Sequence, residues 1–190
     1  MQQDTLHRQN VQNLQGRILP FVGGGPGGLS AAYFLQLMGH QVTVYEMLPK
    51  LGGMLRYGIP NYRLTKERLD DDIQAILDTG VKVDCGKAIG KDYSIVDLKE
   101  KYDAVLITIG ASTDKKLGLE GEDAKGVISA VQFLRNVGYG TQESLEGKEV
   151  AVIGGGNVSM DAVRTSVRLG AKKVSIVYRR KSCRYDSTSR

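Results

Sequence analysis

The pattern of apolar residues changes period twice in the first quarter of the chain. A short apolar run ends at Val22, and apolar residues then recur at helical spacing at Leu29, Ala32, Leu35 and Met38. Gly39 stops that run, and Val42 and Val44 then alternate with Thr43 and Tyr45 up to Glu46. These periods predict a strand, an amphipathic helix and a buried strand ending at Glu46.

The same pattern returns in the last quarter of the chain. Residues Val150 to Ile153 predict a strand, Asp161 to Leu169 a helix that stops at Gly170, and Val174 to Tyr178 a second strand. Strands that alternate with helices are typical of an α/β fold with parallel sheets. We therefore expect two Rossmann-like dinucleotide-binding units, both incomplete, over residues 16–112 and 113–190, after a mobile lead-in over residues 1–15.

A glycine-rich loop follows the first strand of each unit. In the first loop, Gly23, Gly25 and Gly28 match G-x-G-x-x-G; in the second, Gly154 and Gly156 are followed by Ser159 at the third small position. The first glycine allows a tight turn, the second lets a pyrophosphate approach the backbone, and the third small residue lets helix and strand pack closely. The following helix directs its free N–H groups at the phosphates. Two such loops predict two dinucleotides.

Different residues follow the second strands of the two units. Glu46 ends the second strand of the first unit, where a carboxylate suits the hydroxyl groups of a ribose. In the second unit the strand ends in Arg179 and Arg180, and guanidinium groups suit a 2′-phosphate. The second dinucleotide is therefore predicted to be NADPH rather than NADH. The alternatives are a surface glutamate and a solvated basic end.

Three further segments carry a resemblance to a known family. They are Leu51 to Leu64 (LGGMLRYGIPNYRL), the second glycine loop continued through Arg164, and Lys116 to Asp123. In this order they resemble the flavin-proximal loop, the NADPH loop and the inter-domain crossover of the glutamate synthase small-subunit family. That family includes related FAD-dependent NADPH oxidoreductases and the N-terminal half of dihydropyrimidine dehydrogenase. A plainer reading of Leu51 to Leu64 is an ordinary Gly/Pro-rich connection.

The resemblance implies roles for individual residues. Around FAD, it places the pyrophosphate on the first loop, the adenosine ribose at Glu46, the flavin beside Gly53 and Met54, and the adenine past Ile89, with Arg63 against the cofactor. Asp103 to Ile107 looks like the strand that leads to a second flavin contact, Thr108-Ile109-Gly110, made through Gly110, although the family usually has Thr at position 109. The implied pyrophosphate residues are Gly23, Gly25, Pro26, Gly27 and Gly28. The implied NADPH residues are Gly154, Gly156, Asn157, Val158, Arg179 and Arg180.

Charge, hydropathy and cysteine usage exclude several other classes. Residues 173–190 carry six basic residues and one acidic residue, whereas the preceding 172 residues carry twenty of each, so no general footprint for nucleic acid exists. No apolar run is long enough for a membrane span, no apolar signal core is present, and the cytoplasm is the default location. Cys85 and Cys183 form no C-x-x-C pair for disulfide chemistry. Asp70-Asp71-Asp72 is read as a solvated helix face, and we identify no metal ligands or general acid–base residues.

The sequence thus predicts a flavoprotein oxidoreductase. NADPH would pass a hydride to FAD, and electrons would leave singly to an iron–sulfur protein or a large catalytic subunit. The chain alone is expected to be an incomplete enzyme, because the second unit stops after its second strand whereas a dinucleotide-binding half needs at least βαβαβ. Two alternatives stay open: a non-catalytic nucleotide-binding fragment, and a dehydrogenase with a single NAD(P) cofactor.

Overall fold

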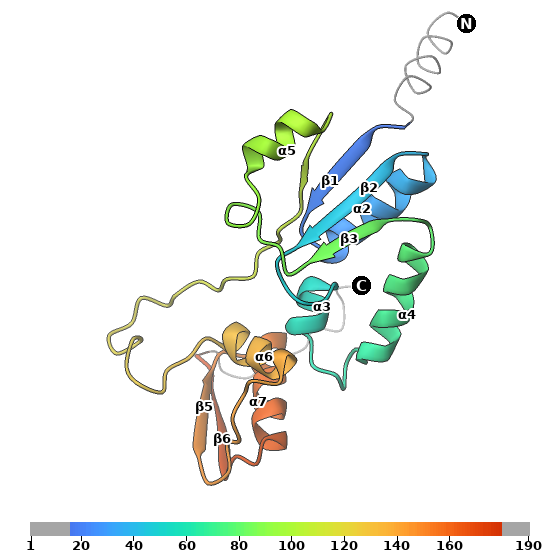
Figure 1. Ribbon diagram of the computed structural model, residues 1–190. Helices are drawn as coiled ribbons and strands as arrows, with labels where there is room; N and C mark the ends of the chain where they lie inside the picture. The colour runs from blue at the N-terminus through green and yellow to red at the C-terminus, as the bar shows by residue number, and fades with distance from the viewer. Residues whose placement is uncertain (1–15, 180–190) are drawn as a thin grey trace, which may run out of the picture. The chain divides into compact units, whose positions relative to one another are not determined.

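The computed structural model describes residues 16–179, which form two compact units divided between Ser112 and Thr113 (Figure 1). Both units combine helices with parallel strands, which confirms the α/β class. Within residues 16–179 no helix combines the length and the apolar character that a membrane crossing requires.

The first unit is built on a four-stranded parallel sheet with the order β3-β2-β1-β4. Its strands are β1 (Ile18–Val22), β2 (Gln41–Glu46), β3 (Lys82–Cys85) and β4 (Leu106–Ile107). The order reverses between β1 and β4, because the chain first steps outward to β2 and β3 and then returns to the other side of β1. Ligands of open α/β sheets bind at the carboxyl ends of the strands beside such a reversal.

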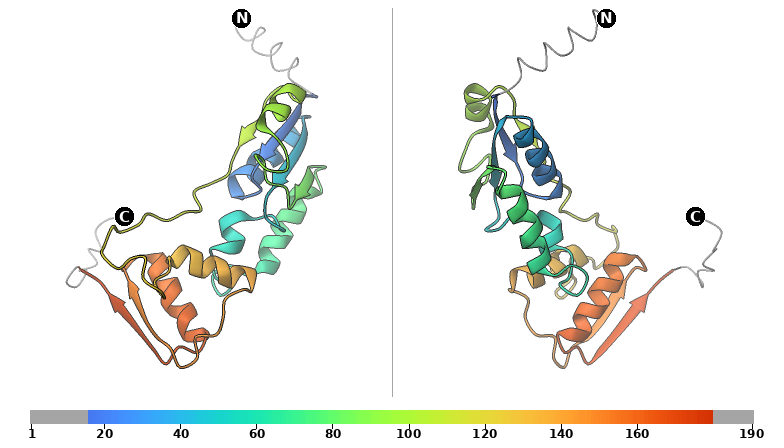
Figure 2. Two further views of the ribbon diagram at one scale, coloured as in Figure 1. Left: turned by 60° about the vertical axis from the view of Figure 1, so that its left-hand side comes forward. Right: turned by 90° about the vertical axis from the view of Figure 1, so that its right-hand side faces the viewer.

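Four helices connect these strands: α2 (Pro26–Leu37), α3 (Gly53–Tyr57), α4 (Lys66–Leu77) and α5 (Ile95–Lys101). Right-handed crossovers place the helices before and after a reversal on opposite faces of a sheet. Figure 2 shows this arrangement, with α2 on one face of the sheet and α5 toward the other. The face of the sheet that α2 covers carries the core of this unit, where side chains of α2 and α4 pack with side chains of β2. These residues are Leu29, Ala32, Leu69, Ile73, Val42 and Val44.

Pro20 lies inside β1, where a strand paired on both sides normally needs its N–H. The N–H of Gly23 donates to the Tyr45 carbonyl on the β2 side, so strand alternation turns the nitrogen of residue 20 toward β4. Pairing between β1 and β4 begins only at Phe21 with Leu106. The missing donor explains why β4 is shorter than the predicted strand from Asp103 to Ile107.

The second unit contains α6 (Ala130–Tyr139), β5 (Glu149–Ile153), α7 (Asn157–Arg168) and β6 (Lys173–Val177). Strands β5 and β6 pair in parallel, from Glu149 with Lys173 to Ile153 with Val177. Helix α7 begins one turn before the predicted Asp161, because Gly156 already supplies the extended backbone of an N-cap. The large apolar side chains of Ile153, Ile176 and Val177 remain exposed on this sheet.

The two units differ in the size of their cores, and we expect the first to be the more stable. Nine buried hydrophobic residues form the first core, whereas Phe133, Leu134, Val152 and Ala162 form the second. The free energy needed to open a region of a protein rises with the apolar surface that this region buries. In native-state hydrogen exchange, the amides of Val42 and Val44 should therefore exchange more slowly than those of Val150 and Val152. Equal protection in both strands would contradict this expectation.

Candidate functional site

The first glycine loop lies at the reversal of the sheet, between the ends of β1 and β4. Gly23 has a φ of 111°, which non-glycine residues rarely adopt. After β4, the backbone N–H of Thr108 donates to the Val22 carbonyl at 2.8 Å, and Thr108 Oγ1 donates to the Gly23 carbonyl at 2.9 Å. Thr108 therefore holds the start of the loop against the neighbouring strand.

Two glycines of this loop are required by contacts within the protein. A methyl carbon built on Gly28 would overlap the Gly23 carbonyl oxygen and lie 2.7 Å from Thr108 Oγ1. A methyl carbon built on Gly23 would lie 2.5 Å from the Thr108 carbonyl oxygen. By contrast, a methyl carbon on Gly27 would meet nothing within 4 Å. The loop is thus pressed against the end of β4 at Gly23 and Gly28, whereas the space beside Gly27 is open.

The helices that follow the glycine loops differ from the other long helices at their N-termini. The side chains of Thr65, Ser94 and Ser129 accept backbone N–H groups at the starts of α4, α5 and α6. Helices α2 and α7 instead follow the N-cap residues Gly25 and Gly156 and have no side-chain cap, as is also true of the short helix α3 after Gly52. Their first N–H groups are therefore available to an anion, which the helix dipole also favours.

Glu46 is buried beneath the first loop and is only 5% exposed. Its Oε2 accepts the N–H of Gly24 at 2.7 Å, and its Oε1 accepts the N–H of Leu48 at 2.8 Å. A carboxylate has about four acceptor positions, so lone pairs remain for the hydroxyl groups of a ribose. The predicted ribose contact stays a prediction. The two backbone bonds give Glu46 a second role, which is to fix the loop itself.

The segment from Leu51 to Leu64 is docked onto the first loop through glycines. The N–H of Gly52 donates to the Gly24 carbonyl at 2.8 Å. Gly53 approaches Gly25 so closely that a methyl carbon on Gly53 would lie 2.8 Å from the Gly25 Cα atom. The structure therefore brings the predicted residues Gly25 and Gly53 together, and Met54 follows in the first turn of α3.

Two cationic side chains hold α3 in place. Arg56 is buried, and its guanidinium donates to the Leu51 carbonyl and pairs with Asp70 of α4. Lys66 Nζ donates to the carbonyls of Leu55 and Ile59, at 3.3 and 2.9 Å. The hydrogen bond from Arg56 lowers the pKa of Asp70, and burial lowers the pKa of Lys66.

The acidic triplet Asp70-Asp71-Asp72 lies in the middle of α4. The side chain of Asp70 is 54% exposed, but it forms an ion pair with Arg56. The interpretation of the triplet as a solvated helix face did not predict this ion pair. Among residues 16–179 no cluster of three or more His, Cys, Asp or Glu side chains is arranged to hold a metal ion.

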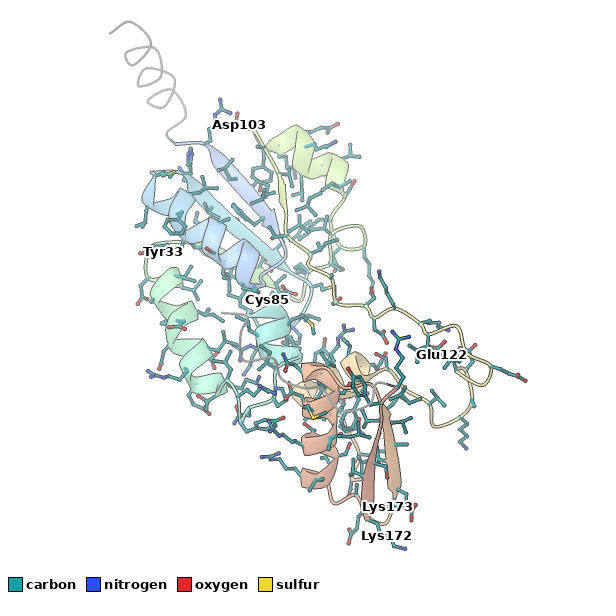
Figure 3. All side chains as sticks on the ribbon, turned by 180° about the vertical axis from the view of Figure 1, so that it is seen from behind. Tyr33, Cys85, Asp103, Glu122, Lys172 and Lys173 are labelled. Atoms are coloured by element: carbon teal, nitrogen blue, oxygen red, sulfur yellow. The ribbon has the colours of Figure 1, made fainter. Side chains whose placement is uncertain are left out.

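The remaining residues predicted around FAD occupy separate positions in the first unit. Arg63 is exposed in the turn between α3 and α4, Ile89 is half-buried after β3, and Gly110 follows β4 with a φ of 70°. Cys85 ends β3 (Figure 3) and packs against the core, and its burial raises the pKa of the thiol. Its pKa and packing suit a structural residue rather than a reactive thiolate.

The second glycine loop repeats the geometry of the first. Gly154 has a φ of 126°, and a methyl carbon on it would lie 2.7 Å from the Oγ atom of Ser159, the third small residue. The predicted residues Gly156, Asn157 and Val158 are exposed at the start of α7. Arg179 is exposed just after β6, at the same end of the sheet as the loop, whereas Arg180 lies outside the described residues. Lys172 and Lys173 lie at the opposite end of β6 (Figure 3).

Sequence reasoning missed three contributors to these loops: Thr108 as a clamp on Gly23, Arg56 with Asp70 as an anchor of α3, and Tyr178. The ring of Tyr178 covers Gly155, because a methyl carbon on that glycine would lie 2.7 Å from Cδ2 and Cε2 of the ring. Pairwise contacts of this kind leave no periodic signal in a sequence. The sequence could have indicated Tyr178 only through a comparison of the two predicted strand ends, at Glu46 in the first unit and at Tyr178 in the second.

Comparisons with known proteins agree with this geometry. Residues 19–189 match the family described as pyridine nucleotide-disulphide oxidoreductase. The chain is 45% identical over 167 residues to the NADP(+)-dependent formate dehydrogenase subunit beta of Moorella thermoacetica, covering 87% of this chain and 24% of the relative. It is 38% identical over 175 residues to the glutamate synthase [NADPH] small chain of Escherichia coli, covering 87% and 37%. The predicted resemblance is thereby confirmed.

Solved structures support the same fold. The structure of Mycobacterium tuberculosis FprA in complex with NADPH superposes with a TM-score of 0.74 at 25% identity. The match covers 87% of this chain and 44% of FprA. The chain therefore spans less than half the length of FprA, and 24% and 37% of the two relatives above.

Proposed function

Because this chain belongs to the pyridine nucleotide-disulphide oxidoreductase family, we propose that it carries the nucleotide-binding loops of an FAD-dependent NADPH oxidoreductase. The Gly23 loop would hold FAD and the Gly154 loop NADPH. The observation that carries this proposal is that a strand leads, in each unit, through a glycine loop with positive φ into a helix of 12 residues without a side-chain cap. One such loop would serve a single cofactor; two serve a donor and an acceptor of hydride.

The residues present fit both nucleotides. In the first unit, Gly25, Gly27 and Gly28 would offer backbone N–H groups to the FAD pyrophosphate, and Glu46 would keep its remaining lone pairs for the ribose. In the second unit, Gly156, Asn157 and Val158 would offer the corresponding N–H groups to NADPH. Arg179 carries the positive charge that a 2′-phosphate requires. Methyl carbons on Gly27 and Gly156 would meet nothing within 4 Å, so the protein leaves space beside each loop.

The FAD held by the first loop would supply a hydride acceptor for NADPH and a source of single electrons. The side chains of this protein would bind and orient rather than transfer protons. The Arg56–Asp70 pair and Thr108 would keep the loops rigid, which is how positioning contributes to rate. Related proteins are named as a beta subunit and a small chain, which supports an iron–sulfur protein or a large catalytic subunit as the electron acceptor.

The proposal can be tested by adding FAD to the purified chain under anaerobic conditions and then adding NADPH. Binding of both FAD and NADPH would support the two-loop assignment, whether or not the flavin is reduced, because the chain alone is expected to be an incomplete enzyme. Binding of FAD alone would favour the non-catalytic fragment, and binding of NADPH alone would favour the single-cofactor dehydrogenase. Either of the latter results would contradict the assignment of two nucleotides to this chain.

Replacement of Arg179 and Arg180 by Ala should weaken NADPH binding far more than NADH binding. A charge-assisted hydrogen bond contributes about 1.5–3 kcal/mol, so the loss in NADPH affinity should be about tenfold or more. Nucleotide titrations of the parent and the double variant measure both affinities. The matched control is Lys172→Ala with Lys173→Ala, which removes the same charge at the far end of β6. An equal loss for NADPH and NADH would contradict the assignment of the arginines.

A further inference from the structure

An exposed apolar patch lies at the C-terminal end of α2, on the side of the helix that faces away from the sheet. This α2 patch consists of Phe34, Leu37 and Met38, whose side chains are 57%, 60% and 59% exposed. Their helical spacing places them opposite Leu29 and Ala32, which pack in the core. The outer side of a surface helix normally carries polar and charged residues, and a contiguous apolar patch marks an interaction site.

The sequence around the α2 patch carries no charge. Between Arg17 and Glu46 the chain contains no Asp, Glu, Lys or Arg. A partner that binds through ion pairs would therefore find no complementary charge on α2. The chemistry of the patch instead fits an occupant that presents apolar side chains and little net charge.

The chain before β1 leaves the first unit beside this patch. The N–H of Gly16 donates to the carbonyl of Gly39 at 3.1 Å, and Gly39 directly follows Met38. From there Phe34 lies five residues back along the chain, which is about 8 Å along a helix axis. Residues 1–15 would span about 22 Å as a helix and more as an extended chain, so they can reach the whole patch.

The sequence of residues 1–15 is suited to cover the α2 patch. Leu6, Val11 and Leu14 are spaced five and three positions apart, which brings them within an arc of about 140° on a helix. The remaining residues are mostly polar, and the segment has one acidic and one basic side chain, which cancel. It thus combines a narrow apolar stripe with little net charge, as the occupant requires.

We propose that residues 1–15 form an amphipathic strap that docks on the α2 patch through Leu6, Val11 and Leu14. The strap takes the place of the mobile lead-in that polar composition alone predicts. A second copy of the chain is a poorer occupant, because a stable dimer buries about 800 Å² on each partner and three side chains offer only a part of that area. A tethered segment needs less area, since its attachment beside the patch keeps its effective concentration high.

The test measures the motion of the strap in the full chain by backbone amide relaxation in NMR. Order parameters are about 0.85 for rigid backbone and below about 0.6 for a flexible segment. The strap variant replaces the apolar stripe by serine, as Leu6→Ser, Val11→Ser and Leu14→Ser. The matched control replaces residues on the opposite side of the strap by serine, as Thr5→Ser, Gln9→Ser and Gln12→Ser. The patch variant is Phe34→Ser with Leu37→Ser.

In the parent and the control, the amides of residues 6–14 should have order parameters of about 0.8. These values should fall below about 0.6 in the strap variant and in the patch variant. The methyl signals of Leu37 and Met38 should shift in the strap variant and stay unchanged in the control. Unchanged amide signals of Val42 and Val44 verify that the first unit stays folded in each variant.

Three results would overturn the proposal. The first is a strap that is already flexible in the parent, and the second is an ordered strap that the patch variant does not release. The third is a shift of the Leu37 and Met38 methyl signals with the concentration of the parent chain, which would show that a second copy covers the patch. An equal loss of order in the strap variant and the control would likewise refute docking through the apolar stripe.

Discussion

Replacement of Gly28 by Ala should unfold the first unit or abolish its affinity for FAD. The added methyl group would overlap the Gly23 carbonyl oxygen and crowd Thr108 Oγ1. These atoms belong to the backbone and to a side chain held by two hydrogen bonds, so neither can move aside freely. Overpacking of this kind costs about 1–3 kcal/mol or more, which is a large part of the stability of a small domain. Thermal unfolding followed by circular dichroism measures the loss.

Gly27→Ala is the matched control for this variant. It adds the same methyl group one residue earlier, where nothing lies within 4 Å and φ is not positive. Alanine at such a position reduces the entropy of the unfolded chain, so stability should be unchanged or slightly raised, by up to about 1 kcal/mol. Similar melting temperatures for Gly27→Ala and Gly28→Ala would show that the close packing of the loop does not stabilise the fold.

Replacement of Glu46 by Ala should produce a loss of similar size for a different reason. The change removes the acceptor of the Gly24 and Leu48 N–H groups at a residue that is only 5% exposed. Each hydrogen bond to a charged group contributes about 1.5–3 kcal/mol, and an unsatisfied buried donor adds its own cost. We expect about 3 kcal/mol or more of destabilisation in denaturant unfolding. Glu46→Gln should be intermediate, since an amide can accept with only one of its two terminal atoms.

Glu122 provides the control for Glu46. Its carboxylate also accepts two backbone N–H groups, from Leu117 and Gly118, both at 2.8 Å. Glu122 is half-buried, but both of its hydrogen bonds lie at the surface, so water can replace the lost acceptor in Glu122→Ala. That variant should change stability by about 0.5 kcal/mol or less. A large effect of Glu122→Ala together with a small effect of Glu46→Ala would refute the argument from burial.

The fold class and the positions of both loops could be predicted from the sequence, because they depend on local signals. Apolar residues at every second position predicted β2, and apolar residues three to four positions apart predicted α2. The spacing of the glycines predicted the turns between strand and helix. The strand β2 ends at Glu46 as predicted. Strand β4 was predicted too long, because its length depends on Pro20, which is distant in sequence and only adjacent in the sheet.

The candidate site was predicted less completely than the fold. Motif spacing found the glycines, Glu46 and the arginines, since these follow the ends of strands at fixed distances. It could not find the clamp of Thr108 on Gly23 or the pairing of Arg56 with Asp70, which join residues from different elements. It also assigned Glu46 only to a ligand, whereas burial and two backbone bonds give it a structural role as well.

The central claim is that the two loops hold different nucleotides, and mapping of backbone amide signals by NMR tests it most directly. FAD and adenosine 2′,5′-bisphosphate are titrated separately into the chain, at concentrations high enough to detect weak binding. FAD should shift the signals of Gly27, Gly28 and Leu29, and the bisphosphate those of Gly156, Asn157 and Arg179. Shifts of a single loop by both ligands, or of the Gly23 loop by the bisphosphate, would contradict the account.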